Sequence, residues 1–177
     1  MKSIGLVGGT FEFFHVGHQK LIKTALSYCD NLEIWIISDE IARRKDPRIS
    51  AWKERCDFIR LNLSLEHNSR VSFHVLADKF GVATYHDKAS MIFCTSETKS
   101  NCLLINKKRI EDGLDELSII EVPHVYSEDG NIISSSRIRD GKIDPNGKIW
   151  FNEGILDSDL YLTCLLYTSD AADEASS

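Results

Sequence analysis

Short apolar segments alternate with amphipathic ones along most of this chain of 177 residues. Five of the apolar segments have the length and composition of buried β-strands, and they span residues 2–7, 32–37, 71–76, 91–95 and 117–122. Strands that are separated by helices pair in parallel through right-handed crossovers and carry helices on both faces of the sheet. We therefore expect an α/β fold with a doubly wound, parallel, five-stranded sheet.

The segments between these strands have apolar residues at helical spacing. Residues 16–29 predict one helix, and Ser50 is expected to cap a second helix with a stripe of Trp52, Cys56, Ile59 and Leu63. A third helix carries Leu103 and Ile105 and ends in a basic run at residues 107–109, and a last one is expected to begin near residues 134–136. In such folds ligands bind at the carboxyl ends of the strands, so chemistry is expected there.

Composition excludes several classes of protein. Hydrophobic residues make up 42% of the chain, but there is no run of about 18 apolar residues that could cross a membrane. A net charge of −6 argues against binding to long nucleic acids, which requires a basic face. Five cysteines without CxxC spacing predict a reducing compartment, the cytoplasm, and no metal site, because zinc ligands would have to come from distant cysteines.

The end of the chain resembles translated DNA rather than protein. Residues from Cys164 onward match the translation of a transposase adapter used in sequencing libraries, so we expect residues 164–177 to be an artefactual, disordered tail. The alternative is an ordinary acidic tail. The Asp144–Gly147 stretch is expected to be the exit from the folded body. We accordingly predict a domain at residues 1–147, followed by a C-terminal extension at 148–163 with no assigned fold.

The strongest motif follows the first predicted strand and enters the first predicted helix. Residues 8–18 read Gly-Gly-Thr-Phe-Glu-Phe-Phe-His-Val-Gly-His. Gly8 and Gly9 allow close approach of the backbone to a ligand, and a helix N-terminus presents free N–H groups and a positive dipole end. His15 and His18 fall on the same side of the helix, and Gly17 leaves room beside them. This pattern predicts a polyphosphate site; the plain alternative is a tight turn with two solvated histidines.

Residues 8–18 resemble the first signature of the nucleotidyltransferase superfamily, Gly-Gly-Thr-Phe followed by His-x-Gly-His. Residues 133–139, Ile-Ser-Ser-Ser-Arg-Ile-Arg, resemble its second signature. Class I aminoacyl-tRNA synthetases carry a related motif, but this chain is too short to be one of them. Together with residues 38–45, 95–109 and 122–130, the two signatures resemble the phosphopantetheine adenylyltransferases of archaeal and eukaryotic type, over about residues 4–147.

This resemblance implies a Rossmann-like fold of the HxGH nucleotidyltransferase type. It also implies transfer of AMP from ATP to 4′-phosphopantetheine, which gives dephospho-coenzyme A and pyrophosphate in coenzyme A biosynthesis. Mg²⁺ is the implied metal, the implied partners are these small molecules, and a monomer is expected. Because the acceptor phosphate is already anionic near neutral pH, positioning and charge neutralisation are expected to suffice for catalysis.

The resemblance also implies residue roles. Thr10 contacts the acceptor phosphate, His18 stabilises charge on the α-phosphate, and Lys45 supplies a cation to the transferring phosphate, with Arg43, Arg44 and Arg48 as alternatives to Lys45. Asn106 contacts the acceptor. The implied ATP-binding residues are Gly8, Gly9, Thr10, Phe11, His15, Gly17, His18, Ser96, Glu97, Thr98, Ser134, Ser135, Ser136 and Arg139.

Other residues of these types are expected to be structural. They are His67, His74, His86, His124, Trp35, Trp52 and Cys94. The chain departs from the family at Glu12, where an aspartate is common, and at residues 99–102, where relatives often have a turn with glycine. The run at residues 107–109 suits either a phosphate or a helix C-terminus.

Two other functions remain open from the sequence. The first is a related nucleotidyltransferase with another acceptor, such as glycerol phosphate, choline phosphate, FMN or NMN. The second is a non-catalytic nucleotide-binding regulator, which would bind ATP without releasing pyrophosphate.

Overall fold

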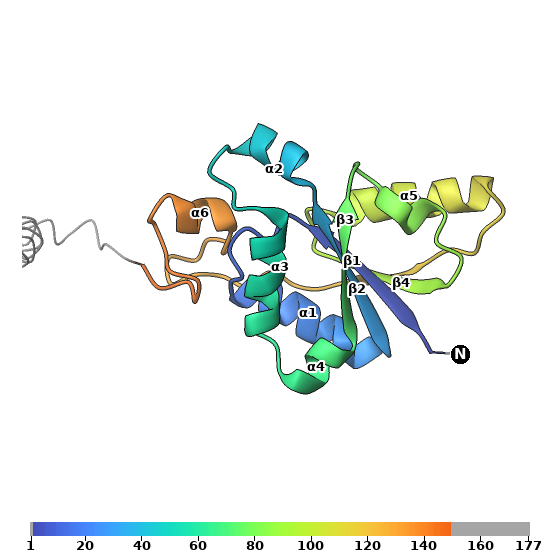
Figure 1. Cartoon of the computed structure of the whole chain (residues 1–177), viewed down its shortest axis with the longest axis horizontal. Helices are drawn as coiled ribbons and strands as arrows, with labels where there is room; N and C mark the ends of the chain where they lie inside the picture. The colour runs from blue at the N-terminus through green and yellow to red at the C-terminus, as the bar shows by residue number, and fades with distance from the viewer. Residues whose placement is uncertain (1, 150–177) are drawn as a thin grey trace, which may run out of the picture.

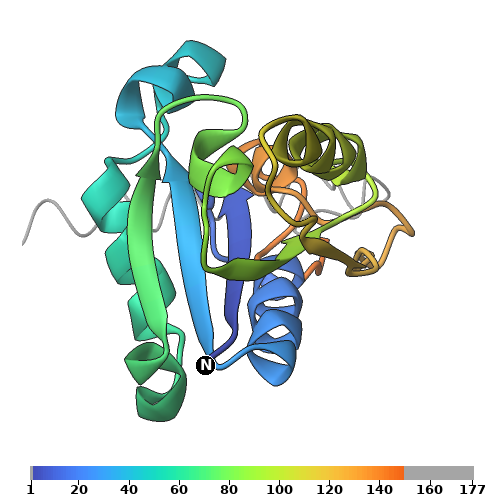
Figure 2. The ribbon, with the colours of Figure 1, turned by 90° about the vertical axis from the view of Figure 1, so that its right-hand side faces the viewer.

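A five-stranded, all-parallel sheet forms the centre of the protein, whose computed structural model describes residues 2–149 (Figure 1). The strand order is β3-β2-β1-β4-β5, so the chain winds outward from β1 first to one side and then to the other. The strands are β1 (Ile4–Gly9), β2 (Asn31–Ile37), β3 (Val71–Leu76), β4 (Ala89–Cys94) and β5 (Ser118–Glu121). Figure 2 shows these strands side by side. The doubly wound α/β fold predicted from the sequence is therefore confirmed.

Helices cover both faces of the sheet. They are α1 (Val16–Tyr28), α2 (Asp39–Lys45), α3 (Trp52–Leu61), α4 (Leu65–Ser69), the 3-10 helix η1 (Gly81–Thr84), α5 (Lys99–Glu111) and α6 (Ser135–Arg139). In Figure 1, where the sheet is seen nearly edge-on, α3 and α5 lie on opposite sides of it. One core cluster joins α1 and α3 to the sheet, and the other joins α5 and η1 to its opposite face.

The two cores alternate along each strand, as expected when successive side chains point to opposite faces. In β1, Leu6 packs on the side of α5 and Val7 on the side of α1, and both are about fully buried. Gly5 allows the Phe93 ring to pack closely against β1, because a Cβ at this position would lie 2.6 Å from that ring. Strand β1 therefore lies between the two cores, and its carboxyl end leads into the first signature.

Element boundaries differ from the sequence expectation at three places. The first strand continues through Gly8 and Gly9, because they pair with Trp35 and Ile36 of β2. Helix α3 has Ala51 at its N-cap instead of Ser50: the Glu54 carboxylate accepts the Ala51 N–H at 3.0 Å. Residues 99–102 form the first turn of α5, although they lie where relatives often have a glycine-containing turn.

The expected exit from the domain at residues 144–147 is a packed turn. Ile143 is fully buried and forms a β-bridge with Ile149. The Pro145 carbonyl accepts the backbone N–H of Val16 at 3.1 Å, at the start of α1. The packed chain thus extends at least two residues beyond the predicted boundary at 147. The remainder of the predicted extension, 150–163, and the predicted tail, 164–177, lie outside the described residues.

Across residues 2–149, no helix is long and apolar enough to span a membrane. The four cysteines in this range are free and buried, which includes Cys94, as predicted.

Candidate active site

A polar cleft lies at the carboxyl ends of β1 and β4, where the strand order reverses direction. Its volume is about 250 Å³. The cleft brings together most of the residues that the two signatures single out: Gly8, Gly9, Thr10, Phe11, His15, Gly17, His18, Lys45, Glu97, Thr98, Ser134, Ser135, Ser136 and Arg139. Segments about 120 residues apart therefore form one site.

The turn after β1 has a strained backbone. Phe11 adopts a φ of 51°, the left-handed region, and among the described residues it is the one non-glycine that does so. Its ring is buried beneath the turn, and a Cβ on Gly9 would lie 2.8 Å from it. A glycine at position 9 thus makes room for the ring that fixes the turn. Such strain is typical of functional sites.

His15 and His18 stack with ring centroids 3.8 Å apart, and single backbone contacts give them different tautomers. The Nδ1 of His15 accepts the backbone N–H of His18 at 3.4 Å, so neutral His15 carries its hydrogen on Nε2. The Nδ1 of His18 lies 2.9 Å from the Phe13 carbonyl oxygen, which can only accept, so Nδ1 holds the hydrogen there. Neutral His15 is therefore a donor at Nε2, whereas His18 becomes a donor at Nε2 only when it is protonated.

Burial lowers the pKa of both histidines. The pKa of His15 falls to about 4. The pKa of His18 falls to about 3, through burial and then the neighbouring His15, although its bond to Phe13 acts in the opposite direction. Both side chains are thus neutral at pH 7 in the free protein. An anion in the cleft would offset the cost of burial and favour the charged form of His18.

Of the basic residues at positions 43, 44, 45 and 48, Lys45 is the one that lines the cleft. It is the last residue of α2, and its side chain is exposed to the cleft. The alternatives lie elsewhere: Arg44 pairs with Glu40, Arg48 pairs with Asp46, and Arg43 is exposed and does not line the cleft. The geometry thus selects Lys45 from the four candidates.

The second signature contacts the first directly. The Ser135 hydroxyl accepts the backbone N–H of Phe13 at 3.3 Å, and Ser134 and Ser136 share a hydrogen bond of 3.1 Å. Arg137 is turned away from the cleft and pairs with Asp129. Arg139 faces the cleft but pairs with two carboxylates, those of Glu12 and Asp46. This pairing was not predicted from the sequence.

Two of the predicted residues do not line the cleft. Asn106 is buried, and its amide both donates to and accepts from the Leu117 backbone at 2.9 Å, so the structure does not bring it to the acceptor side. Ser96 lies beside the cleft and bonds to His124, which does line it. His124 was expected to be structural. Its position after Pro123, just beyond the carboxyl end of β5, is the sequence feature that could have predicted its place at the cleft.

The buried side chain of Arg55 supports the first signature segment through hydrogen bonds to the backbone. The guanidinium of Arg55 donates to the carbonyl oxygens of Thr10 at 2.7 Å, Ile37 at 2.8 Å and Ser50 at 3.0 Å. It also pairs with Asp39 at 2.9 Å. Helix α3 is thereby fastened to the carboxyl ends of β1 and β2, and the peptide of Thr10 is fixed.

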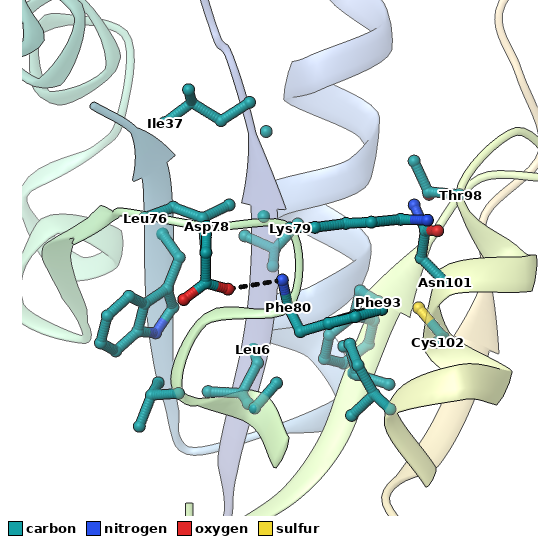
Figure 3. A pocket seen from close by; sticks show the side chains of 18 of the residues that line it. Leu6, Ile37, Leu76, Asp78, Lys79, Phe80, Phe93, Thr98, Asn101 and Cys102 are labelled. Atoms are coloured by element: carbon teal, nitrogen blue, oxygen red, sulfur yellow. Dashed lines mark hydrogen bonds between the residues drawn. The ribbon is translucent and has the colours of Figure 1, made fainter. Parts of the chain in front are cut away.

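A second, mostly apolar cavity of about 420 Å³ adjoins the cleft (Figure 3). Leu6, Phe80 and Phe93 project into it from the sheet and from the segment after β3. Asp78 shapes the rim, because its carboxylate accepts the backbone N–H groups of Phe80 at 2.8 Å and Gly81 at 2.6 Å. The two cavities share the lining residues Gly8, Gly9, Phe93 and Thr98. A ligand in one could therefore reach a ligand in the other across the β1 turn.

This fold and cleft are those of a nucleotidyltransferase, and the cytidylyltransferase-like family matches residues 6–141. The phosphopantetheine adenylyltransferase of Methanopyrus kandleri is 35% identical over 141 residues, which cover 78% of this chain and 89% of that protein. The enzyme of the same name from Methanothermobacter thermautotrophicus is 36% identical, with 83% and 89% covered. The chain belongs to the phosphopantetheine adenylyltransferase family within the cytidylyltransferase-like proteins.

Some relatives are much longer. The bifunctional phosphopantetheine adenylyltransferase/NTP phosphatase of Thermoplasma volcanium is 37% identical over 147 residues, or 82% of this chain, but the match spans only 44% of that protein. A solved structure of a protein of unknown function from Archaeoglobus fulgidus is similar at a TM-score of 0.61 and 26% identity, covering 68% of this chain and 88% of that one. The nicotinic acid mononucleotide adenylyltransferase of Plasmodium falciparum shares the fold at a TM-score of 0.53 and 15% identity, covering 82% and 86%.

Proposed function

We propose that this chain transfers AMP from ATP to 4′-phosphopantetheine. An oxygen of the acceptor phosphate attacks the α-phosphorus, the new P–O bond forms, and the bond to the bridging oxygen breaks to release pyrophosphate. The product is dephospho-coenzyme A. The acceptor phosphate has a second pKa near 6, so it is largely dianionic at pH 7 and no general base is required.

The observation that carries this proposal is the junction of the two cavities. The polar cleft supplies contacts for phosphates, and the apolar cavity accommodates a long, mostly uncharged chain. An acceptor with a phosphate at one end of such a chain places that phosphate at the shared Gly8–Gly9 turn. Glycerol phosphate would leave the apolar cavity empty.

The cleft residues divide the work by position. Gly8 and Gly9 let the backbone approach the α-phosphate, and Thr10 orients the acceptor phosphate. His15 donates from Nε2 to the ATP phosphates, and His18, once protonated, stabilises the charge that develops on the α-phosphate. Lys45 neutralises the transferring group, and residues 134–136 hold the β- and γ-phosphates. Holding two reactants in line can contribute roughly 7–11 kcal/mol to lowering the barrier.

The adenosine end of ATP is assigned to the loop after β4. Glu97 and Thr98 line the cleft there, and Ser96 and His124 bond to one another beside it at 3.0 Å. The backbone N–H and carbonyl groups of this loop are suited to hydrogen-bonding with the edge of adenine. Asn106 supports the loop indirectly by fixing α5 to the start of β5.

Magnesium fits this site as a companion of ATP. Residues 2–149 contain no cluster of three or more His, Cys, Asp or Glu side chains that could hold a metal ion. Mg²⁺ characteristically keeps several waters and binds through substrate phosphates. It would be held by the phosphate oxygens and water, where it neutralises charge on the leaving pyrophosphate. We also propose that the enzyme works as a monomer in the cytoplasm.

A parallel measurement of both products tests the proposal. The full chain is mixed with ATP, magnesium and one acceptor at a time: 4′-phosphopantetheine, glycerol phosphate, FMN or NMN. We expect pyrophosphate and dephospho-coenzyme A in equal amounts with 4′-phosphopantetheine and at least about tenfold less pyrophosphate with the others, a difference of 1.4 kcal/mol in transition-state binding. A faster reaction with another acceptor would reassign the substrate, and ATP binding without pyrophosphate release would indicate a regulator.

A further inference from the structure

Arg139 is the centre of a compact ion-pair network that joins three segments of the site. Its Nε and Nη2 donate to the two carboxylate oxygens of Glu12, at 2.9 and 2.5 Å, and its Nη1 donates to Asp46 at 2.9 Å. The three side chains are only 13%, 5% and 12% exposed. The network therefore links the turn after β1, the end of α2 and helix α6 away from bulk water.

The charges within this network are balanced. Asp46 also accepts two hydrogen bonds from the Arg48 side chain, at 3.0 and 2.8 Å, so two carboxylates face two guanidinium groups. Bonds from Arg48 lower the pKa of Asp46, and the bond to Glu12 raises the pKa of Arg139. A guanidinium that is already held by a bidentate carboxylate has little net charge to offer a phosphate.

Asp46 is also the residue at which α2 ends. It is the C-cap of this helix, and its backbone N–H donates to Ala42 at 3.1 Å. A helix of seven residues is not stable by itself, and within α2 only Ala42 is buried. The first turn is secured by Ser38 and by the pair between Asp39 and Arg55. The last turn, which carries Lys45, is secured through Asp46.

We infer that Glu12, Asp46 and Arg139 are positioning residues that tie the last turn of α2 to both signature segments and so hold the Lys45 amine at the cleft. This inference revises the phosphate contact that the sequence suggested for Arg139. Its kinetic consequence rests on the proposed transferase function. Its structural consequence, the anchoring of α2, does not depend on that function.

The kinetic test removes the Asp46 charge without changing its size. We expect Asp46→Asn to lower kcat by about 10- to 100-fold, the cost of a small misplacement of a catalytic group, with the Kd for ATP within about twofold of the wild type. In a Lys45→Ala background the same substitution should have no further effect, because it acts through Lys45. Glu40→Gln, which removes an exposed carboxylate from the same helix, is the matched control and should leave kcat unchanged.

Two kinetic results would overturn the inference. One is that the losses from Asp46→Asn and Lys45→Ala multiply in the double variant. The other is that Asp46→Asn weakens ATP binding as much as it lowers kcat. Asp46→Glu retains the carboxylate and should recover part of the lost kcat; no recovery would argue against the ion pair with Arg139.

Amide hydrogen exchange tests the anchoring of α2 without requiring catalysis. Residues 39–45 should exchange faster in Asp46→Asn and in Arg139→Gln than in the wild type or Glu40→Gln. Unchanged exchange of residues 39–45 in both variants would show that the network does not anchor α2, even if the enzyme is active. An inactive wild-type chain with faster exchange in the variants would instead support the anchoring of α2 and reject the transferase function.

Discussion

At the scale of single residues, the site depends on which nitrogen of each histidine carries a hydrogen. The backbone contacts of His15 and His18 leave one a neutral donor and the other a group that must gain a proton to donate. In the proposed reaction, the phosphates of ATP would supply the negative charge that favours that proton. The two histidines are therefore expected to contribute differently, although they stack on one another.

Replacement of His18 by alanine should affect the reaction far more than the binding of ATP. The charge that His18 stabilises is largest in the transition state, so we expect kcat to fall by about 10²- to 10³-fold while the Kd for ATP changes by less than about threefold. Initial rates of pyrophosphate release and calorimetric titration with ATP measure the two quantities. His67→Ala on the surface helix α4 is the control. Equal losses in kcat and ATP affinity would assign His18 to ground-state binding instead.

The lowered pKa values also predict how stability depends on pH. Below pH 6.5 the unfolded chain binds protons that the buried histidines of the folded chain do not, so stability falls as the pH drops from about 6.5 towards 4 for His15 and towards 3 for His18. At pH 5 the cost for His15 alone is about 2 kcal/mol. Carboxylates with a lowered pKa, such as Asp129, lose their contribution at lower pH, below about 4.

Urea unfolding at pH 7 and pH 5 measures this cost. The wild type should lose stability between the two values, and His15→Gln should reduce that loss by about 2 kcal/mol, while His67→Gln should not. An identical loss in the wild type and in His15→Gln would mean that His15 is charged in the folded protein.

The residues whose place at the cleft was easiest to predict from the sequence are those that lie close together in the chain. Gly9, His15 and His18 lie within eleven consecutive residues between a strand and a helix, so their spacing alone brings them together. Asn106 and Arg109 could not be predicted in this way. Arg109 ends a basic run that suggested a solvated helix end, yet it is buried and donates to the carbonyl oxygens of Ala83, His86 and Asp115. Those partners become neighbours only when η1 packs on α5.

At the scale of elements, one polar side chain joins α3 to the ends of two strands, in addition to the apolar contacts of Cys56 and Ile59. Arg55 satisfies carbonyl groups at the ends of β1 and β2, and its side chain is fully buried. The sequence predicted the apolar stripe of α3 from its periodicity, but a polar residue on the same helix gave no sign that it would turn inward. The ends of strands were harder to predict than their centres, because Gly8 and Gly9 have no side chain to indicate pairing.

Arg55→Met should destabilise the fold substantially. The substitution keeps the unbranched stem but leaves the carbonyl groups of Thr10, Ile37 and Ser50 without the guanidinium donor. At about 1 kcal/mol or more for each unsatisfied group, we expect a loss of about 3 kcal/mol. Urea unfolding of the variant measures the loss. Lys53→Met, an exposed position on the same helix, is the control and should change stability by no more than about 0.5 kcal/mol. A loss below about 1 kcal/mol for Arg55→Met would show that solvent or neighbouring donors replace the guanidinium.

At the scale of the whole molecule, the question is how much of the chain the reaction needs. The fold could be predicted because alternation of strands and helices admits few topologies. The end of the domain could not, because Ile143 gives no periodic signal and becomes buried only against segments far back in the sequence, while Ile149, which bridges to it, stays exposed. The turn at residues 142–149 also bonds to α1 through Pro145 and to the backbone of Glu128 through Gly147.

A pair of truncations therefore gives opposite expectations. A chain ending at Ile149 should keep the stability, kcat and KM of the full chain within about twofold, because it retains the cleft residues from Gly8 to Arg139 and the turn at residues 142–149 that bonds to α1. A chain ending at Gly141 should lose about 3 kcal/mol or more, since it removes a buried isoleucine and the partner of the Val16 N–H. Urea unfolding and pyrophosphate release report the two effects. If the chain ending at Ile149 is stable but slow, residues beyond 149 take part in the reaction, and a third chain ending at residue 163 then decides the matter. Full activity in that chain would place the missing contribution in residues 150–163 and leave the adapter-like residues 164–177 without a role.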